Sequence, residues 1–181
     1  MKTYIALLRG INVSGQKKIK MADLKSLFES LDFKNVKTYI QSGNVIFDMD
    51  EMPTEHLEQA IEYRLQKTYG FDVTTIVTNP TDLQHIVHNS PYINDASVDV
   101  NRLFVCFLKT APEPDAMDKL NNITLEEEYF HVFDNVVYIH VPHGIGRAKL
   151  NNNFIENKLK VVATTRNWKT INKLIELSKG E

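Results

Sequence analysis

Several short polar segments of this 181-residue chain combine glycine with basic or amide side chains, a composition that suits anion binding. Glycine lets backbone N–H groups approach a ligand closely, and a helix that begins after such a loop adds unpaired N–H donors. An arginine side chain can hold a phosphate or carboxylate through two parallel hydrogen bonds. The candidate ligand-binding residues are Arg9, Gly10, Asn12, Lys17, Lys18, Gln41, Ser42, Gly43, Asn44, Gly144, Gly146, Arg147, Lys149, Arg166, Asn167 and Trp168.

The same glycines have a second explanation, because tight turns and helix entry also require them. Gly144 and Gly146 do not form a dinucleotide-binding fingerprint, since the third glycine and a parallel βαβ unit are missing. The chain has no Walker A pattern either. Both explanations stay open at the level of sequence, and neither identifies a cofactor.

Patterns for catalysis or metal binding are weaker. His85 and His88 have no third ligand nearby in the sequence, so we expect no metal site. Ser42 does not lie in a nucleophile elbow, and a Ser-His-Asp site using His143 would require the two halves of the chain to face each other. The consecutive acids 126–128 cannot all share one face, so we expect a solvated loop there. No catalytic residue is assigned.

Hydrophobic periodicity predicts the elements that must position these segments. An apolar run that ends at Leu8 predicts a buried strand, and the spacing of Leu24, Leu27 and Phe28 predicts one face of a helix. The expected strands are 4–8, 36–40, 45–47 and 72–78 in the first half, and 103–108, 129–133, 136–141 and 161–165 in the second. The expected helices begin near 21 and 54 and then cover 81–88, 112–120, roughly 150–159 and 168–178.

Each half therefore has the element order βαββαβ followed by a helix, which predicts an α+β protein of two ferredoxin-like subdomains. We expect the subdomains at 1–90 and 98–181, with the polar segment 89–101 as the connection. The first strand of each half is apolar at every position, which indicates that both faces of each sheet are covered.

This topology predicts which loops meet. The first and second strands run in the same direction, so loop 9–18 and turn 41–44 should lie at one edge of the first sheet. In the second half, loop 143–147 and the end of the fourth strand at 165–168 should share an edge. We further expect the halves to pack into one compact body, in which loop 9–18 lies near 143–149 or 165–168 and forms one basic cleft.

Composition and charge exclude several classes of protein. The formal net charge is −2, so no general attraction to nucleic acid or membranes is implied. The single cysteine, Cys106, excludes an internal disulfide framework and is expected to be a small core residue. The N-terminus resembles no signal peptide, and no apolar run approaches the length of a membrane span, so we expect a cytoplasmic protein and no membrane partner.

Four motifs resemble a known family. They are LRGINV at 8–13, TYIQSGNVIF at 38–47, G-x-G-R-A-K-L at 144–150 and ATTRNWKTINKL at 163–174. Together they resemble the uncharacterised bacterial family catalogued as domain of unknown function 1697, over nearly the whole chain. The resemblance implies a cytosolic bacterial protein with two ferredoxin-like subdomains, but no activity. Lys20 stands where relatives commonly have proline before the first helix, a departure that touches helix entry.

The leading hypothesis is the binding of an anionic ligand, phosphorylated or nucleotide-like, in a basic loop cleft between the subdomains. An enzyme acting on a small polar substrate in that cleft is an alternative, and a structural or oligomerisation protein is another. RNA bound at the loop edges, with Trp168 as a stacking residue, is a further option. RNA readout on the sheet face is disfavoured, because the third strands carry the single aromatic residues Phe47 and Tyr138. The sequence does not specify an oligomeric state.

Overall fold

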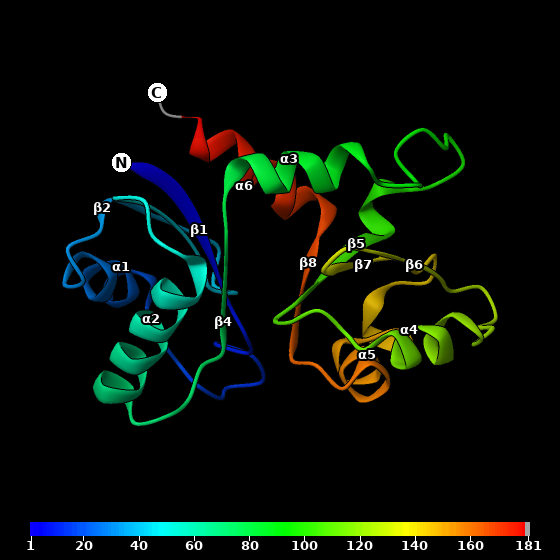
Figure 1. Ribbon diagram of the computed structural model, residues 1–181, viewed down its shortest axis with the longest axis horizontal. Coiled ribbons are helices and arrows are strands. Elements are labelled where there is room, and N and C mark those ends of the chain that lie inside the picture. Colours follow the sequence, from blue (N-terminus) through cyan, green and yellow to red (C-terminus); the bar gives the residue numbers. More distant parts are fainter. Residues whose placement is uncertain (180–181) are drawn as a thin grey trace. The chain divides into compact units, whose positions relative to one another are not determined.

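The computed structural model describes residues 1–179 and divides the chain into two compact units (Figure 1). Unit 1 comprises residues 1–85 together with the chain from Lys173 onward, and unit 2 comprises Ile86–Asn172. The chain leaves unit 1 within α3 (Pro80–His88) and returns to it within α6 (Trp168–Ser178). The second half expected from the sequence contains all of α6, whereas this division splits α6 after Asn172.

Unit 1 is a four-stranded antiparallel sheet with helices against one face. Its elements are β1 (Lys2–Leu8), α1 (Met21–Glu29), β2 (Lys34–Tyr39), β3 (Asn44–Met49), α2 (Thr54–Tyr69) and β4 (Thr75–Thr78). The strand order is β2-β3-β1-β4, with every neighbouring pair antiparallel. Figure 1 shows α1 and α2 on the same side of this sheet.

Unit 2 repeats this arrangement. Its elements are a 3-10 turn (Val100–Arg102), β5 (Leu103–Leu108), α4 (Pro114–Asn121), β6 (Tyr129–Phe133), β7 (Val136–His140), a second 3-10 turn (Ile145–Arg147), α5 (Asn152–Leu159) and β8 (Ala163–Asn167). The strand order β6-β7-β5-β8 matches that of unit 1. The expected fold class, α+β with two ferredoxin-like units, is confirmed.

Both fourth strands begin later in the sequence than expected. The β-branched residues at 72–78 predicted a strand over that whole range, but β4 begins only at Thr75. Pairing with β1 sets this boundary, since Thr75 lies opposite Leu8, the last residue of β1. A residue with strand propensity forms no strand where it has no partner strand to bond.

The central strands are buried on both faces, as expected. In β1, Tyr4, Ala6 and Leu8 belong to the core that α1 and α2 cover. Ile5 and Leu7 point to the opposite face, and both are also fully buried. None of the helices in residues 1–179 has the length and apolar character needed to cross a lipid bilayer.

The two units share loop contacts as well as strand order. In each unit, the last residue of the central strand donates its backbone N–H to a carbonyl in the turn before the third strand. The residue that follows the central strand donates its N–H to the carbonyl just before the fourth strand. The pairs are Leu8 N to Gly43 O (2.8 Å) and Leu108 N to Asn135 O (2.9 Å), then Arg9 N to Thr74 O and Lys109 N to Val162 O (both 2.8 Å). This agreement supports a duplication of structure.

The outer edge of β4 is satisfied by acidic side chains from a helix. Glu58 and Glu62, one turn apart on α2, accept hydrogen bonds from the backbone N–H groups of Val77 and Thr75, each at 2.8 Å. An edge strand otherwise presents unpaired backbone groups, which are costly when buried. Glu58 is itself buried, so its carboxylate replaces the missing neighbouring strand for Val77.

Unit 2 uses the same device on β8. Asn152 and Glu156, again one turn apart, lie on α5, the helix before the fourth strand. Glu156 accepts the Ala163 N–H at 2.8 Å, and the Asn152 amide donates to the Ala163 carbonyl at 2.9 Å. The Thr165 hydroxyl donates to Asn152 Oδ1 at 3.2 Å. Both fourth strands are thus closed by polar residues of the preceding helix.

Replacing Glu58 by leucine should destabilise the protein, because the Val77 N–H would be buried without an acceptor. Leaving such a donor unpaired costs about 1–3 kcal/mol. The free energy of unfolding from urea denaturation measures the loss. Glu58→Gln keeps an acceptor oxygen and should lose less, while Gln59→Leu at the exposed neighbouring position is the control. Equal stability of Glu58→Leu and Gln59→Leu would contradict the assigned role of the carboxylate.

The turn between β2 and β3 depends on Gly43. Its φ is +79°, and a Cβ at this position would lie 2.7 Å from Ile11 Cδ1 and 2.8 Å from Leu8 Cβ. Gly10 has a similar φ of +68°, but a Cβ there would meet nothing within 4 Å. The two glycines share the same backbone requirement and differ in the space around them.

We therefore expect Gly43→Ala to be the more damaging of two matched substitutions. Gly10→Ala should cost about 1–2 kcal/mol for the left-handed conformation alone. Gly43→Ala should cost about 1–3 kcal/mol more, because Leu8 and Ile11 must move. Thermal or chemical denaturation of the two variants measures the difference. Equal stability of the Gly43→Ala and Gly10→Ala proteins would contradict this expectation, because it would show that Leu8 and Ile11 can move aside at little cost.

Candidate functional site

The loop after β1 and the turn after β2 meet at one edge of unit 1, as the topology predicted. The Asn12 amide donates to the Gln41 carbonyl and to the Ile19 carbonyl, both at 2.9 Å. Asn12 Oδ1 accepts the Ile19 N–H at 2.8 Å. This side chain therefore closes loop 12–19 on itself and ties it to the turn, so it has a structural role at the edge.

Further contacts hold the loop in shape. Val13 pairs with Gln16 in an isolated bridge, and the Asn12 N–H donates to the Lys17 carbonyl at 3.2 Å. The Lys17 ammonium donates to the Asp72 carbonyl at 2.5 Å. Of the candidate residues, Lys17 thus anchors the loop to the segment before β4.

The backbone of these two loops is strained. Asn12, Ser14, Lys17 and Ile40 all have positive φ, of 55°, 49°, 43° and 49°. Asparagine tolerates this region, whereas a β-branched residue such as isoleucine rarely adopts it. The Ile40 side chain is 47% exposed, so burial does little to offset the strain. Strain of this kind costs about 1–3 kcal/mol for each residue and clusters at binding sites and switch regions.

The loop and turn line a hollow of about 600 Å³ that we call the loop pocket. Its lining includes Asn12, Lys18, Lys20, Asp23, Gln41 and Tyr69. Lys18 and Lys20 are exposed, and in the described part of the chain no ion pair or hydrogen bond engages their ammonium groups. The pocket thus has two unneutralised cations and one carboxylate, that of Asp23.

Tyr69 adds an aromatic ring to the loop pocket. It is the last residue of α2, and its ring stacks on that of Phe71 with centroids 5.8 Å apart and planes 20° apart. Burial and then the nearby Asp23 carboxylate raise the pKa of Tyr69. Like any tyrosine with a pKa at or above its usual value, it is protonated at neutral pH, and its hydroxyl can donate a hydrogen bond.

The remaining candidates in unit 1 lie around the turn. Asn44 is fully buried, and its amide donates to the Tyr39 carbonyl and to Ser42 Oγ, both at 3.0 Å. Gly10 is exposed and Arg9 half-buried, while Gly43 is buried under the turn. The structure brings Asn12, Lys18 and Gln41 to one pocket and uses the buried polar groups to build the turn.

In unit 2, acidic side chains bind the loop before α5. Glu128 accepts hydrogen bonds from the backbone N–H groups of Lys149 and Leu150, at 2.9 and 2.8 Å. Glu127 pairs with His143 Nε2 at 2.8 Å. The expected solvated loop fits Glu127, whose side chain is 72% exposed, but Glu128 is half-buried and bonds the loop before α5. The backbone N–H of Lys149, a donor that was expected to face a ligand, is bonded to the Glu128 carboxylate instead.

Gly144 lies against an arginine that the sequence analysis did not select. Its φ is +91°, and a Cβ there would lie 2.9 Å from Arg102 Nη1. Arg102 is exposed, and so are Gly146, Arg147 and Lys149. Arg102 immediately precedes β5, so the antiparallel pairing of β5 with β7 could have indicated that it meets the loop after β7.

The last three candidates make contacts inside unit 2. Arg166 is 6% exposed, and its guanidinium donates to Thr164 Oγ1 at 2.8 Å and to the Thr165 carbonyl at 3.0 Å. Burial lowers the pKa of Arg166 to about 10. Trp168 is also 6% exposed, as a core residue would be. Asn167 caps α6, since its Oδ1 accepts the Thr170 N–H at 2.7 Å.

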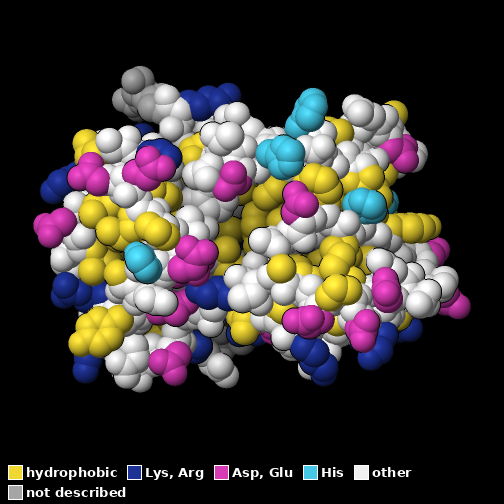
Figure 2. All heavy atoms as spheres, viewed as in Figure 1, with side chains coloured by type: hydrophobic (Ala, Val, Ile, Leu, Met, Phe, Trp, Pro, Cys, Tyr) yellow, Lys and Arg dark blue, Asp and Glu magenta, His cyan; other side chains and the backbone are white. Residues whose placement is uncertain are grey.

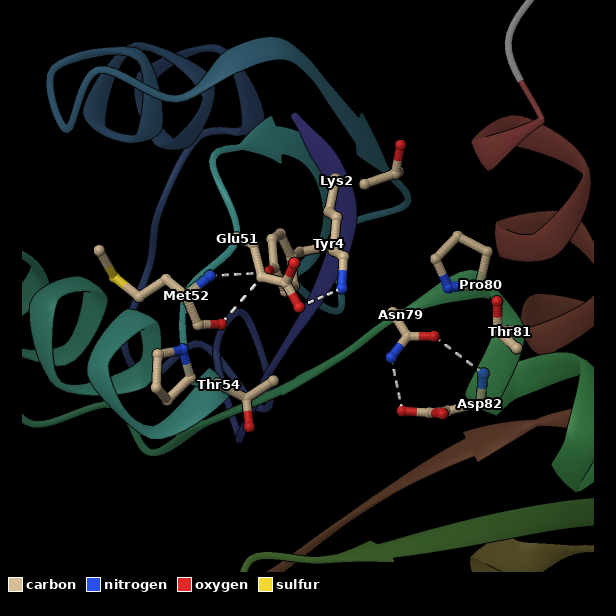
Figure 3. A pocket seen from close by; sticks show the side chains of 11 residues that line it. Lys2, Tyr4, Glu51, Met52, Thr54, Asn79, Pro80, Thr81 and Asp82 are labelled. Atoms are coloured by element: carbon tan, nitrogen blue, oxygen red, sulfur yellow. Dashed lines mark hydrogen bonds and ion pairs between the residues drawn. The ribbon is translucent and has the colours of Figure 1, made fainter.

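A second hollow of unit 1, of about 740 Å³, lies where β1 begins and β4 ends (Figure 3). Its polar side chains bind one another or the backbone. The contacts are an ion pair of Lys2 with Glu51, hydrogen bonds of the Tyr4 hydroxyl with Met52 N and O (both 3.1 Å), and bonds of Asn79 with the Asp82 carboxylate (2.6 Å) and N–H (2.9 Å). This internal pairing makes it a weaker candidate than the loop pocket.

On the face of the molecule that Figure 2 shows, charge does not indicate another site. Figure 2 shows basic and acidic side chains interspersed over the visible face. Among residues 1–179, no group of three or more His, Cys, Asp or Glu side chains is arranged to hold a metal ion. Cys106 is fully buried.

Comparison with protein families and with solved structures gives matches, and comparison with curated proteins gives none. The family described as "Protein of unknown function (DUF1697)" matches residues 1–138. The solved structure of the conserved bacterial protein SP0830 from Streptococcus pneumoniae is similar with a TM-score of 0.76. It is 21% identical in sequence and covers 99% of both chains, a likeness that shows the shared fold. No curated protein matches the sequence significantly.

The family match spans most of the chain and includes the motifs of the loop after β1 and the turn after β2. The structural neighbour has the same fold over its whole length. Because the family model matches more than half of the chain, the chain belongs to the protein family of unknown function DUF1697.

Proposed function

We propose that this protein binds an anionic small molecule, phosphorylated or nucleotide-like, in the loop pocket of unit 1. The observation that carries the proposal is the pair of exposed ammonium groups, Lys18 and Lys20, that line one pocket without an acidic partner. Both ammonium groups border the same hollow, so an anion bound there would be attracted by both.

The organisation of the loop supports this function. Asn12 and Lys17 fix the loop through hydrogen bonds to Gln41, Ile19 and Asp72 before any ligand arrives. A preformed site loses less conformational entropy on binding than a flexible loop does. The strained backbone at Ile40 is a further cost that the fold sustains at this edge.

Neutral groups of the pocket can orient the ligand. The exposed Gln41 side chain carries both a donor and an acceptor, and the protonated Tyr69 hydroxyl supplies a donor. The Asp23 carboxylate repels negative charge, so the anionic group belongs at the lysine side of the pocket.

The wider hypothesis places the ligand in a cleft between the subdomains, with Gly144, Gly146, Arg147 and Lys149 as further contacts. That arrangement stays a prediction. The test of the loop pocket does not depend on it, because Lys18, Lys20, Gln41 and Tyr69 all belong to unit 1.

A titration with ribose 5-phosphate, followed by amide chemical shifts, tests the proposal. We expect the largest shifts at Lys18, Lys20 and Gln41, and weaker binding at higher salt because exposed charges are screened. Lys18→Ala combined with Lys20→Ala should weaken binding about tenfold or more, since a hydrogen bond to a charged group contributes about 1.5–3 kcal/mol.

Lys34→Ala combined with Lys37→Ala is the matched control, because it removes two exposed lysines of β2 that lie outside the loop pocket. This control should bind like the unchanged protein. The proposal is wrong if neither ribose 5-phosphate nor inorganic phosphate shifts the pocket residues. It is also wrong if both double variants lose affinity equally, since that pattern indicates attraction by overall charge.

A further inference from the structure

We infer that the ligand of the loop pocket is a nucleotide, with its base on the Tyr69 ring and its phosphate against Lys18 and Lys20. This inference rests on the proposed anion site and names the chemical class that the site takes. It starts from the position of one aromatic side chain next to two cations in a single hollow.

Tyr69 is placed as a stacking platform. It lines the loop pocket and also an adjoining hollow of about 440 Å³, whereas Phe71 lines neither. Phe71 lies beside Tyr69, with ring centroids 5.8 Å and ring planes 20° apart, and both residues pack against the core of unit 1, which restrains the ring. Tyr69 is half-buried, and its exposed part borders the two hollows.

A base and a phosphate need the two kinds of group that this pocket combines. Aromatic side chains bind bases of any sequence through their π-faces, and cationic side chains hold the backbone phosphates. A sugar phosphate would use the lysines and leave the ring without a partner. Gln41 can meet the hydrogen-bonding edge of a base, because its amide offers a donor and an acceptor.

The size of the hollow agrees with this class of ligand. Its volume of about 600 Å³ lies within the range of roughly 300–1,000 Å³ that is typical of small-molecule sites. Inorganic phosphate would fill only a small part of it. The apolar side chains Ile19 and Met21 line the pocket as well and can cover the body of a nucleoside.

Calorimetry with AMP, ribose 5-phosphate and adenosine tests the inference. We expect AMP to bind about tenfold more tightly than ribose 5-phosphate, because stacking adds to the phosphate contacts. Adenosine should bind more weakly than AMP, because it lacks the charge that the lysines hold. Equal affinities of AMP and ribose 5-phosphate would overturn the nucleotide inference and leave the anion site intact. If neither ligand binds, the anion site itself is wrong, and the nucleotide inference falls with it.

Variants of Tyr69 distinguish a role of its ring in binding from a role of the side chain in stabilising the fold. Tyr69→Ala should weaken AMP binding about tenfold and should affect ribose 5-phosphate no more than Tyr69→Phe does, because both variants lose the hydroxyl. Tyr69→Phe keeps the ring and should retain most of the affinity for AMP. Tyr69→Leu preserves apolar packing against Phe71 and should still lose the preference for AMP. The control is Tyr63→Ala on the same helix, where the ring is 66% exposed and lies outside the loop pocket. Unchanged AMP affinity in both Tyr69→Ala and Tyr69→Leu would overturn the inference.

A free nucleotide and a single strand of RNA share this chemistry. Comparing AMP with the hexanucleotide A6 distinguishes them. Affinity for A6 no higher than for AMP identifies a free nucleotide, and affinity at least tenfold higher identifies a strand that continues beyond the pocket. Both results support a nucleotide site, whereas binding of neither AMP nor A6 overturns it.

Discussion

The central strand of each unit is the constraint on which the other elements depend. β1 is hydrogen-bonded to β3 on one side and to β4 on the other, and both of its faces are buried. Its end at Leu8 therefore decides where the flanking loops can run. Gly43 and Thr74 accept the N–H groups of Leu8 and Arg9, so the turn before β3 and the segment before β4 must both arrive at the same edge. The loop pocket is lined by the loop after β1, the start of α1, the turn before β3 and the last residue of α2.

The duplication extends to side chains whose identities differ. Unit 1 closes its fourth strand with two glutamates and unit 2 with an asparagine and a glutamate, yet each pair is one helical turn apart on the preceding helix. What the two halves share is a geometric requirement, namely polar side chains within hydrogen-bonding reach of the outer backbone groups of an edge strand. Little sequence identity is needed to meet this requirement, which explains why the two units repeat the same structure without an obvious repeat in sequence.

Local patterns sufficed to predict the strands, the topology and the meeting of Asn12 with the turn at Gln41, because hydrophobic period and strand direction determine them. They did not predict Tyr69, which reaches the pocket only because α2 ends just before β4 begins opposite Leu8. Nor did they predict the partner of Glu128, since a carboxylate gives no sign in sequence of which distant N–H groups it will meet. The burial of Arg166 was missed for a related reason, because charged residues are normally exposed.

The closed edge of β4 also limits how this protein can meet other chains. A sheet with an open edge can recruit an extended segment as an additional strand, and many proteins recognise peptides in that way. In unit 1, the outward N–H groups of Thr75 and Val77 are taken by carboxylates, while the opposite edge strand, β2, has an irregular register between Lys34 and Lys37. Lysines and irregularities make an edge a poor template for strand addition. Recognition by unit 1 is thereby directed away from its sheet edges and toward its loops and helices.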